Sequence, residues 1–186
     1  MHKVQHRLRQ VAQHIDTLAE QTGNIVSWLT LGMVLVTGIV VTLRYVFNIG
    51  SIALQESVTY LHATVFMLGA AYTLKHDAHV RVDIFYQRAS RRGRALTDLL
   101  GTLLLLLPVC LFILYDSIDY VAASWAVHEG SREAGGLNGV YLLKTLIPVM
   151  AALMLLQGVA QIIHNLLIVT GRDVTGSADS GMDREL

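Results

Sequence analysis

Four long apolar segments set the pattern of the chain. Aspartate, glutamate, lysine and arginine are absent from residues 25–43, 57–74, 99–115 and 145–171. Crossing the hydrocarbon core of a bilayer, about 30 Å thick, takes roughly 20 helical residues. Lipid offers no partner for free backbone groups, so such segments must be helical. With their interfacial flanks they predict an all-α integral membrane protein with four transmembrane helices, at about 24–47, 53–75, 96–118 and 143–170.

The basic residues predict how these helices are oriented. Eleven of the 14 lysines and arginines lie in 1–24, 75–98 and the tail from residue 171. The other side has only Arg44, Arg132 and Lys144. Short loops rich in lysine and arginine stay in the cytoplasm. Both termini are therefore expected to be cytoplasmic.

The two ends of the chain differ from the central domain, residues 23–170. In residues 1–22, apolar side chains recur at helical spacing opposite polar ones: Val4, Leu8, Val11, Ile15 and Leu18 against His6, Arg9, Gln13 and Asp16. This pattern predicts an amphipathic helix on the inner leaflet; the alternative is a short polar leader that is merely helical. Residues 171–186, rich in glycine, serine and aspartate, are expected to be disordered.

Composition excludes several classes of function. The chain is 53% hydrophobic and 15% charged, and its formal net charge of zero gives no basic field for nucleic acid. Cys110 is the only cysteine, so internal disulfides and C-x-x-C motifs are impossible. The sequence contains no nucleotide-binding loop, nucleophile elbow or zinc-protease motif. We therefore expect neither an enzyme nor a cofactor.

Polar residues form stripes at helical spacing on three of the predicted membrane helices. They are Ser27, Thr30, Thr37 and Arg44 on the first, Gln55, Thr59, His62, Gly69 and Thr73 on the second, and Gln157, Gln161 and His164 on the last. Small and hydroxylated residues allow membrane helices to approach and to hydrogen-bond. The favoured interpretation is that the stripes hold the bundle together, and the alternative is a solute path.

Arg44 ends the first predicted helix and Glu56 begins the second, with a short loop between them. A charge near the hydrocarbon edge costs less when it is paired, so an Arg44–Glu56 ion pair is predicted as a structural brace, with a proton relay as the alternative. Pro108, in the middle of the third helix, removes one backbone hydrogen bond and predicts a bend there.

The histidines are weak candidates for binding haem or metal. His62 and His164 differ in expected depth by about eight residues, roughly 12 Å at the helical rise, which one haem cannot easily bridge. His76 and His79 could form an i, i+3 metal pair with Asp77 or Asp83, but two histidines in a basic loop are little support.

Features of a self-sufficient transporter are missing from the sequence. Such proteins usually have internal repeats and helices broken near mid-membrane, where backbone meets substrate and ions. Neither feature is predicted here, and Glu56, the only candidate for a coupling carboxylate, lies at the membrane edge. The chain is expected to pack against a larger membrane protein.

Several short motifs occur in the order found in one known family. They are Arg44-Tyr45-Val46-Phe47-Asn48, Gln55-Glu56, Leu68-Gly69-Ala70-Ala71-Tyr72 and His79-Val80-Arg81-Val82-Asp83. Over roughly residues 25–165 the chain resembles the small membrane subunit (DctQ-like, or Q subunit) of tripartite ATP-independent periplasmic (TRAP) transporters. Residues 125–136, Leu143-Lys144 and Ile147-Pro148 are similar to a subgroup often labelled mannitol or chloroaromatic compound transporters, although Asn138 stands where a proline is expected.

The resemblance implies a function within a complex in the bacterial inner membrane. A periplasmic binding protein would capture an organic acid or similar solute, and a large elevator-type subunit on a separate chain would import it with sodium. The small subunit would be a scaffold in contact with that subunit and with lipid. The alternatives are a small self-sufficient transporter and a haem-bearing anchor of a redox enzyme. Candidate structural or interface residues are Arg44, Gln55, Glu56, His62, His79, Arg81, Asp83, Lys144, Gln157 and Gln161.

Overall fold

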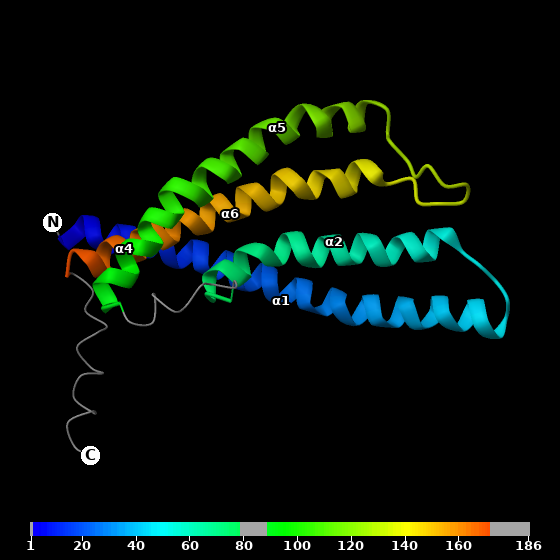
Figure 1. Ribbon diagram of the computed structural model, residues 1–186, viewed down its shortest axis with the longest axis horizontal. Helices are drawn as coiled ribbons and strands as arrows, with labels where there is room; N and C mark the ends of the chain where they lie inside the picture. The colour runs from blue at the N-terminus through cyan, green and yellow to red at the C-terminus, as the bar shows by residue number, and fades with distance from the viewer. Residues whose placement is uncertain (1, 79–88, 172–186) are drawn as a thin grey trace, which may run out of the picture.

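The computed structural model describes residues 2–78 and 89–171, which form helices and loops with no strand in those ranges. The helices are α1 (His2–Val46), α2 (Ile52–Lys75), α4 (Arg91–Gly101), the π-helical segment η1 (Thr102–Leu106), α5 (Leu107–Ala126) and α6 (Val140–Val169). Figure 1 shows α1, α2, α5 and α6 as long, roughly aligned rods. We call the end that holds the start of α1 and the end of α6 the terminal end. The opposite end, with residues 47–51 and 127–139, is the loop end.

The helices pack as two antiparallel pairs that touch along α2 and α6. One pair is α1 with α2, and the other is α5 with α6 (Figure 1). Near the terminal end α6 also packs against α1, α4 and η1. This arrangement makes α6 the helix that connects the two pairs.

Three helical stretches are long and apolar enough to cross a membrane. They are Gln5–Val46, Arg91–Ala126 and Val140–Val169, among the residues that the structure describes. The expected second membrane helix exists as α2, yet it is not one of these three, because Gln55, Glu56 and His62 lower its hydropathy. A fourth crossing by α2 stays a prediction, as does the orientation of the bundle.

Helix α1 runs through the boundary that the sequence predicts near residue 22. Its 45 residues form one α-helix without a break. At about 1.5 Å per residue such a helix is roughly twice as long as the 30 Å hydrocarbon core. One crossing cannot contain all of α1, and the described residues before position 23 belong to the same helix as those after it instead of forming a separate element. That this first half is amphipathic and lies on the inner leaflet stays a prediction.

The helical run from α4 to α5 changes its winding just before Pro108. The backbone N–H of Leu107 donates to the carbonyl of Thr102, five residues earlier, which defines a π-helical turn. Proline has no N–H to donate, and its ring collides with the carbonyl four residues before it. The wider turn meets this constraint without ending the helix. Figure 1 shows the ribbon curving over α4 and α5, the bend expected around Pro108.

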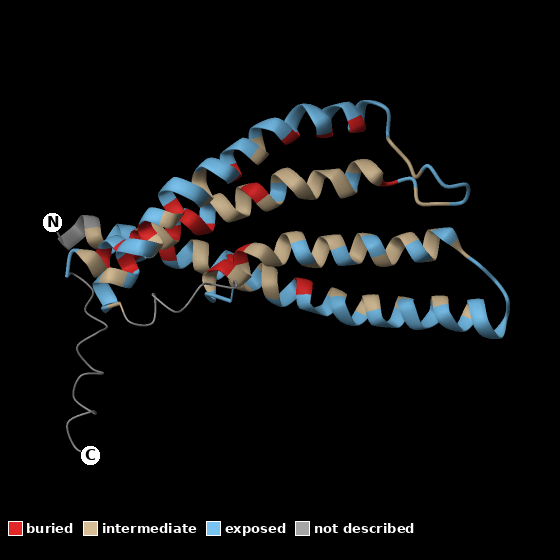
Figure 2. Ribbon diagram, viewed as in Figure 1, coloured by how far each residue is buried: buried red, intermediate tan, exposed pale blue. Residues whose placement is uncertain are grey.

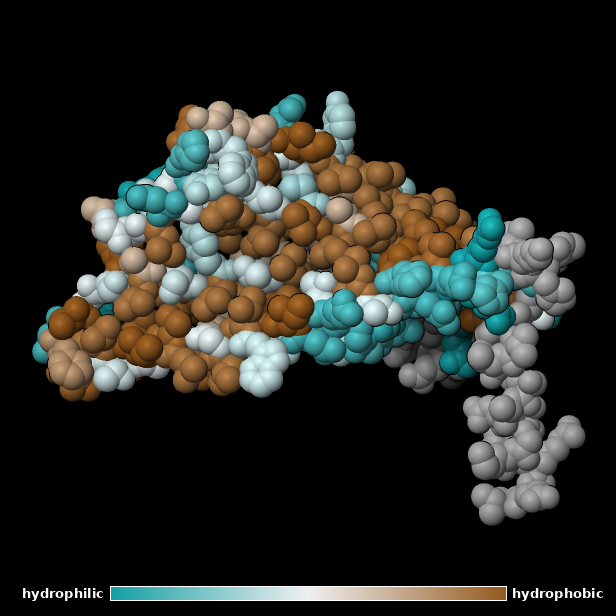
Figure 3. All heavy atoms as spheres, turned by 180° about the vertical axis from the view of Figure 1, so that it is seen from behind, coloured by the Kyte–Doolittle hydropathy of each residue, from teal (hydrophilic) through white to brown (hydrophobic). Residues whose placement is uncertain are grey.

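Burial is concentrated at the terminal end. Ala12, Ala160, Ile163 and Leu167 form a buried cluster, with Ile15 packed against it. In Figure 2 most of the buried segments lie toward this end, and the exposed ones extend toward the loop end. Figure 3 shows that apolar side chains cover most of one face, while polar ones gather toward the terminal end. An apolar exterior suits hydrocarbon, so the packing is that of a membrane bundle.

Candidate functional sites

Asp16 of α1 forms a polar contact with two side chains of α6, which we call the α1–α6 clamp. The Gln157 amide donates to one carboxylate oxygen of Asp16 at 2.9 Å, and His164 Nε2 lies 2.8 Å from the other. Gln157 is only 3% exposed. Since buried polar groups cost free energy unless they are hydrogen-bonded, the clamp specifies how α1 meets α6.

A second polar contact joins α1 to the end of α2. Glu20 accepts hydrogen bonds from Lys75 Nζ at 2.5 Å and from His76 Nε2 at 2.9 Å. Close to it the backbone of Gly23 lies against the ring of Tyr72, where a Cβ would come within 2.3 Å of a ring carbon. The contact therefore needs glycine at position 23.

Helix α6 meets η1 through a threonine and a glycine. The Thr102 hydroxyl donates to the Asp98 carbonyl at 2.7 Å and lies 3.2 Å from Gln161 Oε1. A Cβ on Gly158 would lie 2.8 Å from a methyl carbon of Leu106. The missing side chain of Gly158 thus lets the π-helical turn approach α6 closely.

Glu56 holds the loop of residues 127–139 instead of Arg44. Its carboxylate accepts hydrogen bonds from the Ser131 hydroxyl and, at 2.6 Å, from the Leu137 backbone N–H. The predicted Arg44–Glu56 ion pair is wrong: no such pair occurs among the described residues, and Arg44 is exposed. The loop supplies two neutral donors to Glu56, so the carboxylate is satisfied without a cation.

A charged contact fixes the other side of the same loop. Glu129 lies 2.5 Å from Lys144 Nζ and accepts a 2.7 Å hydrogen bond from the Ser124 hydroxyl. The Lys144 ammonium also lies over the ring of Tyr120, 4.1 Å from its centroid. Hydrogen bonds from Lys144 and then Ser124 hold the pKa of Glu129 below its ordinary value of 4.5.

The first three residues of the polar stripe of α2 face away from the bundle. Gln55, Thr59 and His62 are exposed, and the residues in line with them, Ile52 and Phe66, are exposed as well. These five residues, spaced three and four apart, are called the α2 stripe below. The expectation that polar stripes join helices within the chain is therefore wrong for these residues of α2, whereas Gln157, Gln161 and His164 on α6 do join helices.

The polar stripe of α1 is exposed as well. Ser27, Thr30, Thr37 and Arg44 are all exposed. The hydroxyls of Ser27 and Thr37 donate to carbonyls of their own helix, at 2.7 Å in each case. Hydroxyls can thus be satisfied within a helix, but the guanidinium of Arg44 has no ion-pair partner among the described residues.

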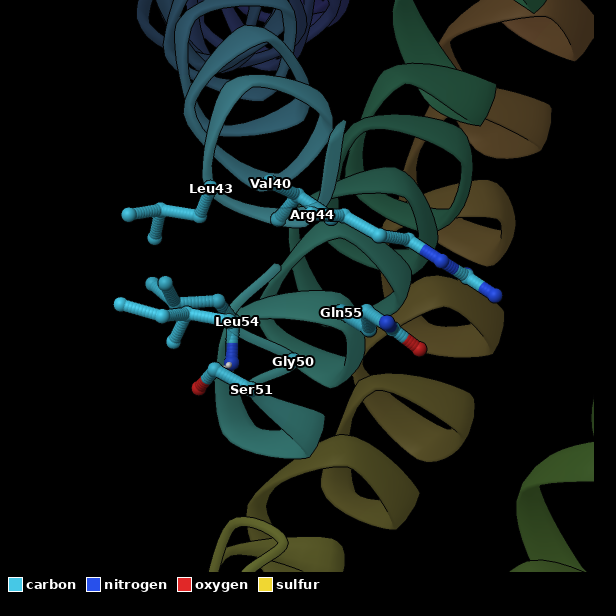
Figure 4. A pocket seen from close by; sticks show the side chains of 8 residues that line it. Val40, Leu43, Arg44, Gly50, Ser51, Leu54 and Gln55 are labelled. Atoms are coloured by element: carbon cyan, nitrogen blue, oxygen red, sulfur yellow. Dashed lines mark hydrogen bonds between the residues drawn. The ribbon is translucent and has the colours of Figure 1, made fainter. Parts of the chain in front are cut away.

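Arg44 and Gln55 lie together at the loop end. Both line a shallow depression where α1 turns into α2, together with Val40, Leu43, Ile49, Gly50, Ser51 and Leu54. Figure 4 shows the side chains of Arg44 and Gln55 pointing to one side, and those of Leu43 and Leu54 pointing to the other. The exposed polar stripes of α1 and α2 therefore meet at this end.

The candidate histidines have different surroundings. His164 contacts Asp16, whereas the ring of His62 stacks on Phe66 of its own helix, with centroids 6.4 Å apart. Within residues 2–78 and 89–171 there is no group of three or more histidine, cysteine, aspartate or glutamate side chains that could hold a metal. The candidates His79, Arg81 and Asp83 lie outside the described residues.

Sequence reasoning missed the clamp carboxylate Asp16 and the loop residues Glu129 and Ser131. Asp16 lies on the polar face of an amphipathic helix, where a solvated residue is the ordinary expectation. Its partners are 141 and 148 residues away in the chain. No local signal could have shown the contact.

Long apolar helices, an apolar exterior and polar contacts that join helices define the protein as a multi-pass α-helical membrane protein. Residues 33–167 match the family model described as Tripartite ATP-independent periplasmic transporters, DctQ component. The match spans most of the chain, which belongs to this family of membrane components of TRAP transporters. A search of curated proteins found no match.

Proposed function

We propose that the chain is the scaffold subunit of a sodium-coupled TRAP transporter that imports an organic acid or similar small solute. It would brace a large elevator-type subunit on a separate chain and work with a periplasmic binding protein. Family membership supports a tripartite transporter. The scaffold role is supported by one observation above all: the clamp residues on α1 and α6 contact each other across the bundle and fix how those helices pack.

Glu56, the candidate coupling carboxylate, is already hydrogen-bonded within the chain. Glu56 accepts its hydrogen bonds from the 127–139 loop of the same chain. A carboxylate that couples transport must exchange its partner during each cycle, whereas these contacts tie the loop to α2. This favours the scaffold role over a small self-sufficient transporter.

Transport by the reconstituted complex tests the scaffold role. Gln157→Ala and Gln161→Ala remove contacts between helices, so we expect less assembled complex in proteoliposomes. The complexes that do assemble should keep their apparent affinities for substrate and sodium within about threefold, since no binding group is lost. A large change in sodium dependence with assembly intact would contradict the proposal and place that residue in the coupling machinery.

The proposal includes the orientation given by the basic loops, with both termini in the cytoplasm and the protein in the bacterial inner membrane. Ala78→Cys and Ala134→Cys place single thiols on exposed positions at opposite ends of the bundle. In a Cys110→Ala background, an impermeant thiol reagent added to spheroplasts should label position 134 and spare position 78. The reverse labelling would show that the orientation is inverted.

A further inference from the structure

The α2 stripe contains three polar residues, which run from Gln55 near the start of α2 to His62, a position that hydrocarbon would surround if the helix crosses the membrane. Gln55 and His62 have no hydrogen-bond partner among the residues that the structure describes. A threonine in a helix can donate to its own backbone, as Thr64 does to the Tyr60 carbonyl at 2.8 Å. A glutamine amide or an imidazole with no partner is costly in lipid, since lipid has no group to bond it. The stripe therefore needs a partner surface that supplies hydrogen-bonding groups.

Arg44 extends this surface to the loop end. It lies beside Gln55, and both side chains point to the same side (Figure 4). A guanidinium at the edge of the hydrocarbon is stabilised by a carboxylate, which it can bind through two parallel hydrogen bonds. The expected carboxylate, Glu56, is already used by the loop.

The outer face of α5 provides the contrast. Val109 and Phe112 are exposed on it, as are Leu104 and Leu105 of the adjoining η1, and all four are apolar. Lipid chains satisfy such a surface completely, so it requires no protein partner. The two surfaces differ in chemistry although both are exposed.

We propose that the α2 stripe, with Arg44 at its end, is the docking surface for the large membrane subunit. This inference rests on the proposed function. The partner surface would be a membrane helix that presents a carboxylate to Arg44 and hydrogen-bonding groups to Gln55 and His62. Apolar side chains of the partner would pack on Ile52 and Phe66. The outer face of α5 would remain in contact with lipid.

Photocrosslinking with a matched pair of phenylalanines tests the surface. Phe66 on the α2 stripe and Phe112 on α5 are 69% and 67% exposed, so their accessibility in the subunit alone is nearly equal. Phe66→p-benzoylphenylalanine and Phe112→p-benzoylphenylalanine are each co-expressed with the large subunit and irradiated in membranes. We expect an adduct with the large subunit from position 66 and none from position 112.

Several outcomes would overturn the inference. An adduct with the large subunit from position 112 alone would move the docking surface to α5. An adduct from position 66 to a second copy of this chain would make the stripe a dimer surface. No adduct from position 66 while the two subunits copurify would refute the surface and leave the proposed function standing. If the wild-type chain does not copurify with a large subunit, the proposed function itself fails.

A second experiment removes the polar groups. The triple variant Gln55→Leu, Thr59→Val and His62→Leu should retain the thermal stability of the isolated subunit, because these side chains contact nothing polar in it. In the complex it should retain about tenfold less large subunit on copurification, a loss of roughly 1.4 kcal/mol. Thr42→Val is the control: Thr42 is exposed on α1 and lies two residues from Arg44, on the opposite side of the helix. An undiminished yield of large subunit in the triple variant would contradict the proposal.

Discussion

The polar stripes of α2 and α6 contain the same two residue types at the same spacing, yet the structure uses them differently. Gln55 and His62 are seven residues apart on α2, and Gln157 and His164 are seven apart on α6. On α6 both contact Asp16 of α1. On α2 both are exposed. A polar stripe on a membrane helix thus predicts a contact, but it does not say whether the partner lies within the chain.

The largest effect should come from removing the shared partner on the α6 side. Asp16→Ala leaves the amide of Gln157 and the ring of His164 without their acceptor. Hydrogen bonds to a charged group are worth about 1.5–3 kcal/mol, so the isolated subunit should lose stability of that order. Thermal unfolding in detergent measures the change. Gln13→Ala, at an exposed position one turn earlier, is the control, and equal stability of the two variants would remove the basis of the comparison.

Two glycines extend the comparison of α2 and α6 to how closely each helix is packed. A Cβ on Gly158 of α6 would lie 2.8 Å from Leu106 and 3.2 Å from Leu107, whereas one on Gly69 of α2 would meet nothing within 4 Å. Overpacking costs about 1–3 kcal/mol, so Gly158→Ala should destabilise the subunit by an amount near the lower limit, since the leucine side chains can move. Gly69→Ala should raise stability by up to about 1 kcal/mol through helix propensity. Thermal unfolding of both variants in detergent gives the sign of each change in stability. Changes of the same sign would mean that the α6 face at Gly158 and the α2 face at Gly69 are packed alike.

Low pH should loosen the 127–139 loop. It should leave the difference in stability between the two glycine variants unchanged. The pKa of Glu129 is lowered in the folded state, so its carboxylate stabilises the fold above its ordinary pKa of 4.5. This contribution disappears as the pH falls below 4.5 through the lowered value. Fluorescence of Trp125, whose indole N–H donates to Thr145 at 2.9 Å, reports the loop in a Trp28→Phe background. Glu129→Gln should reduce the change between neutral and acidic pH without abolishing it, because Glu56 also holds this loop. A change of unaltered size in that variant would assign it to another group.

The smallest effect is expected on the α2 side, and it carries the most information. Gln55→Leu and His62→Leu should each change the stability of the isolated subunit by less than about 0.5 kcal/mol, since surface substitutions rarely do more. Detergent unfolding of the single variants measures this directly. A loss as large as that of Asp16→Ala would mean that the α2 stripe has a partner within the chain after all.

The sequence by itself determined where the long helices lie and that they suit a membrane. Apolarity is a property of each segment, so the runs at 25–43, 99–115 and 145–171 predicted α1, the α4–α5 run and α6 without knowledge of their neighbours. For α2 the sequence predicted the helix, but its polar residues leave its crossing of the membrane a prediction. The motif order also led to the family that the family model shows.

The tertiary structure alone decided which polar residues meet. Asp16 reaches His164 across 148 residues, and Glu56 reaches Leu137 across 81, so no local spacing could predict either contact. Arg44 is nearer to Glu56 in the sequence, but it does not pair with it. Two neutral donors of the loop satisfy the carboxylate of Glu56 instead. Whether a stripe is buried depends on the path of the neighbouring helices, since the spacing of residues states only that they share a face. For this reason Gln55 and Gln157 look equivalent in the sequence, but one is exposed and the other is buried.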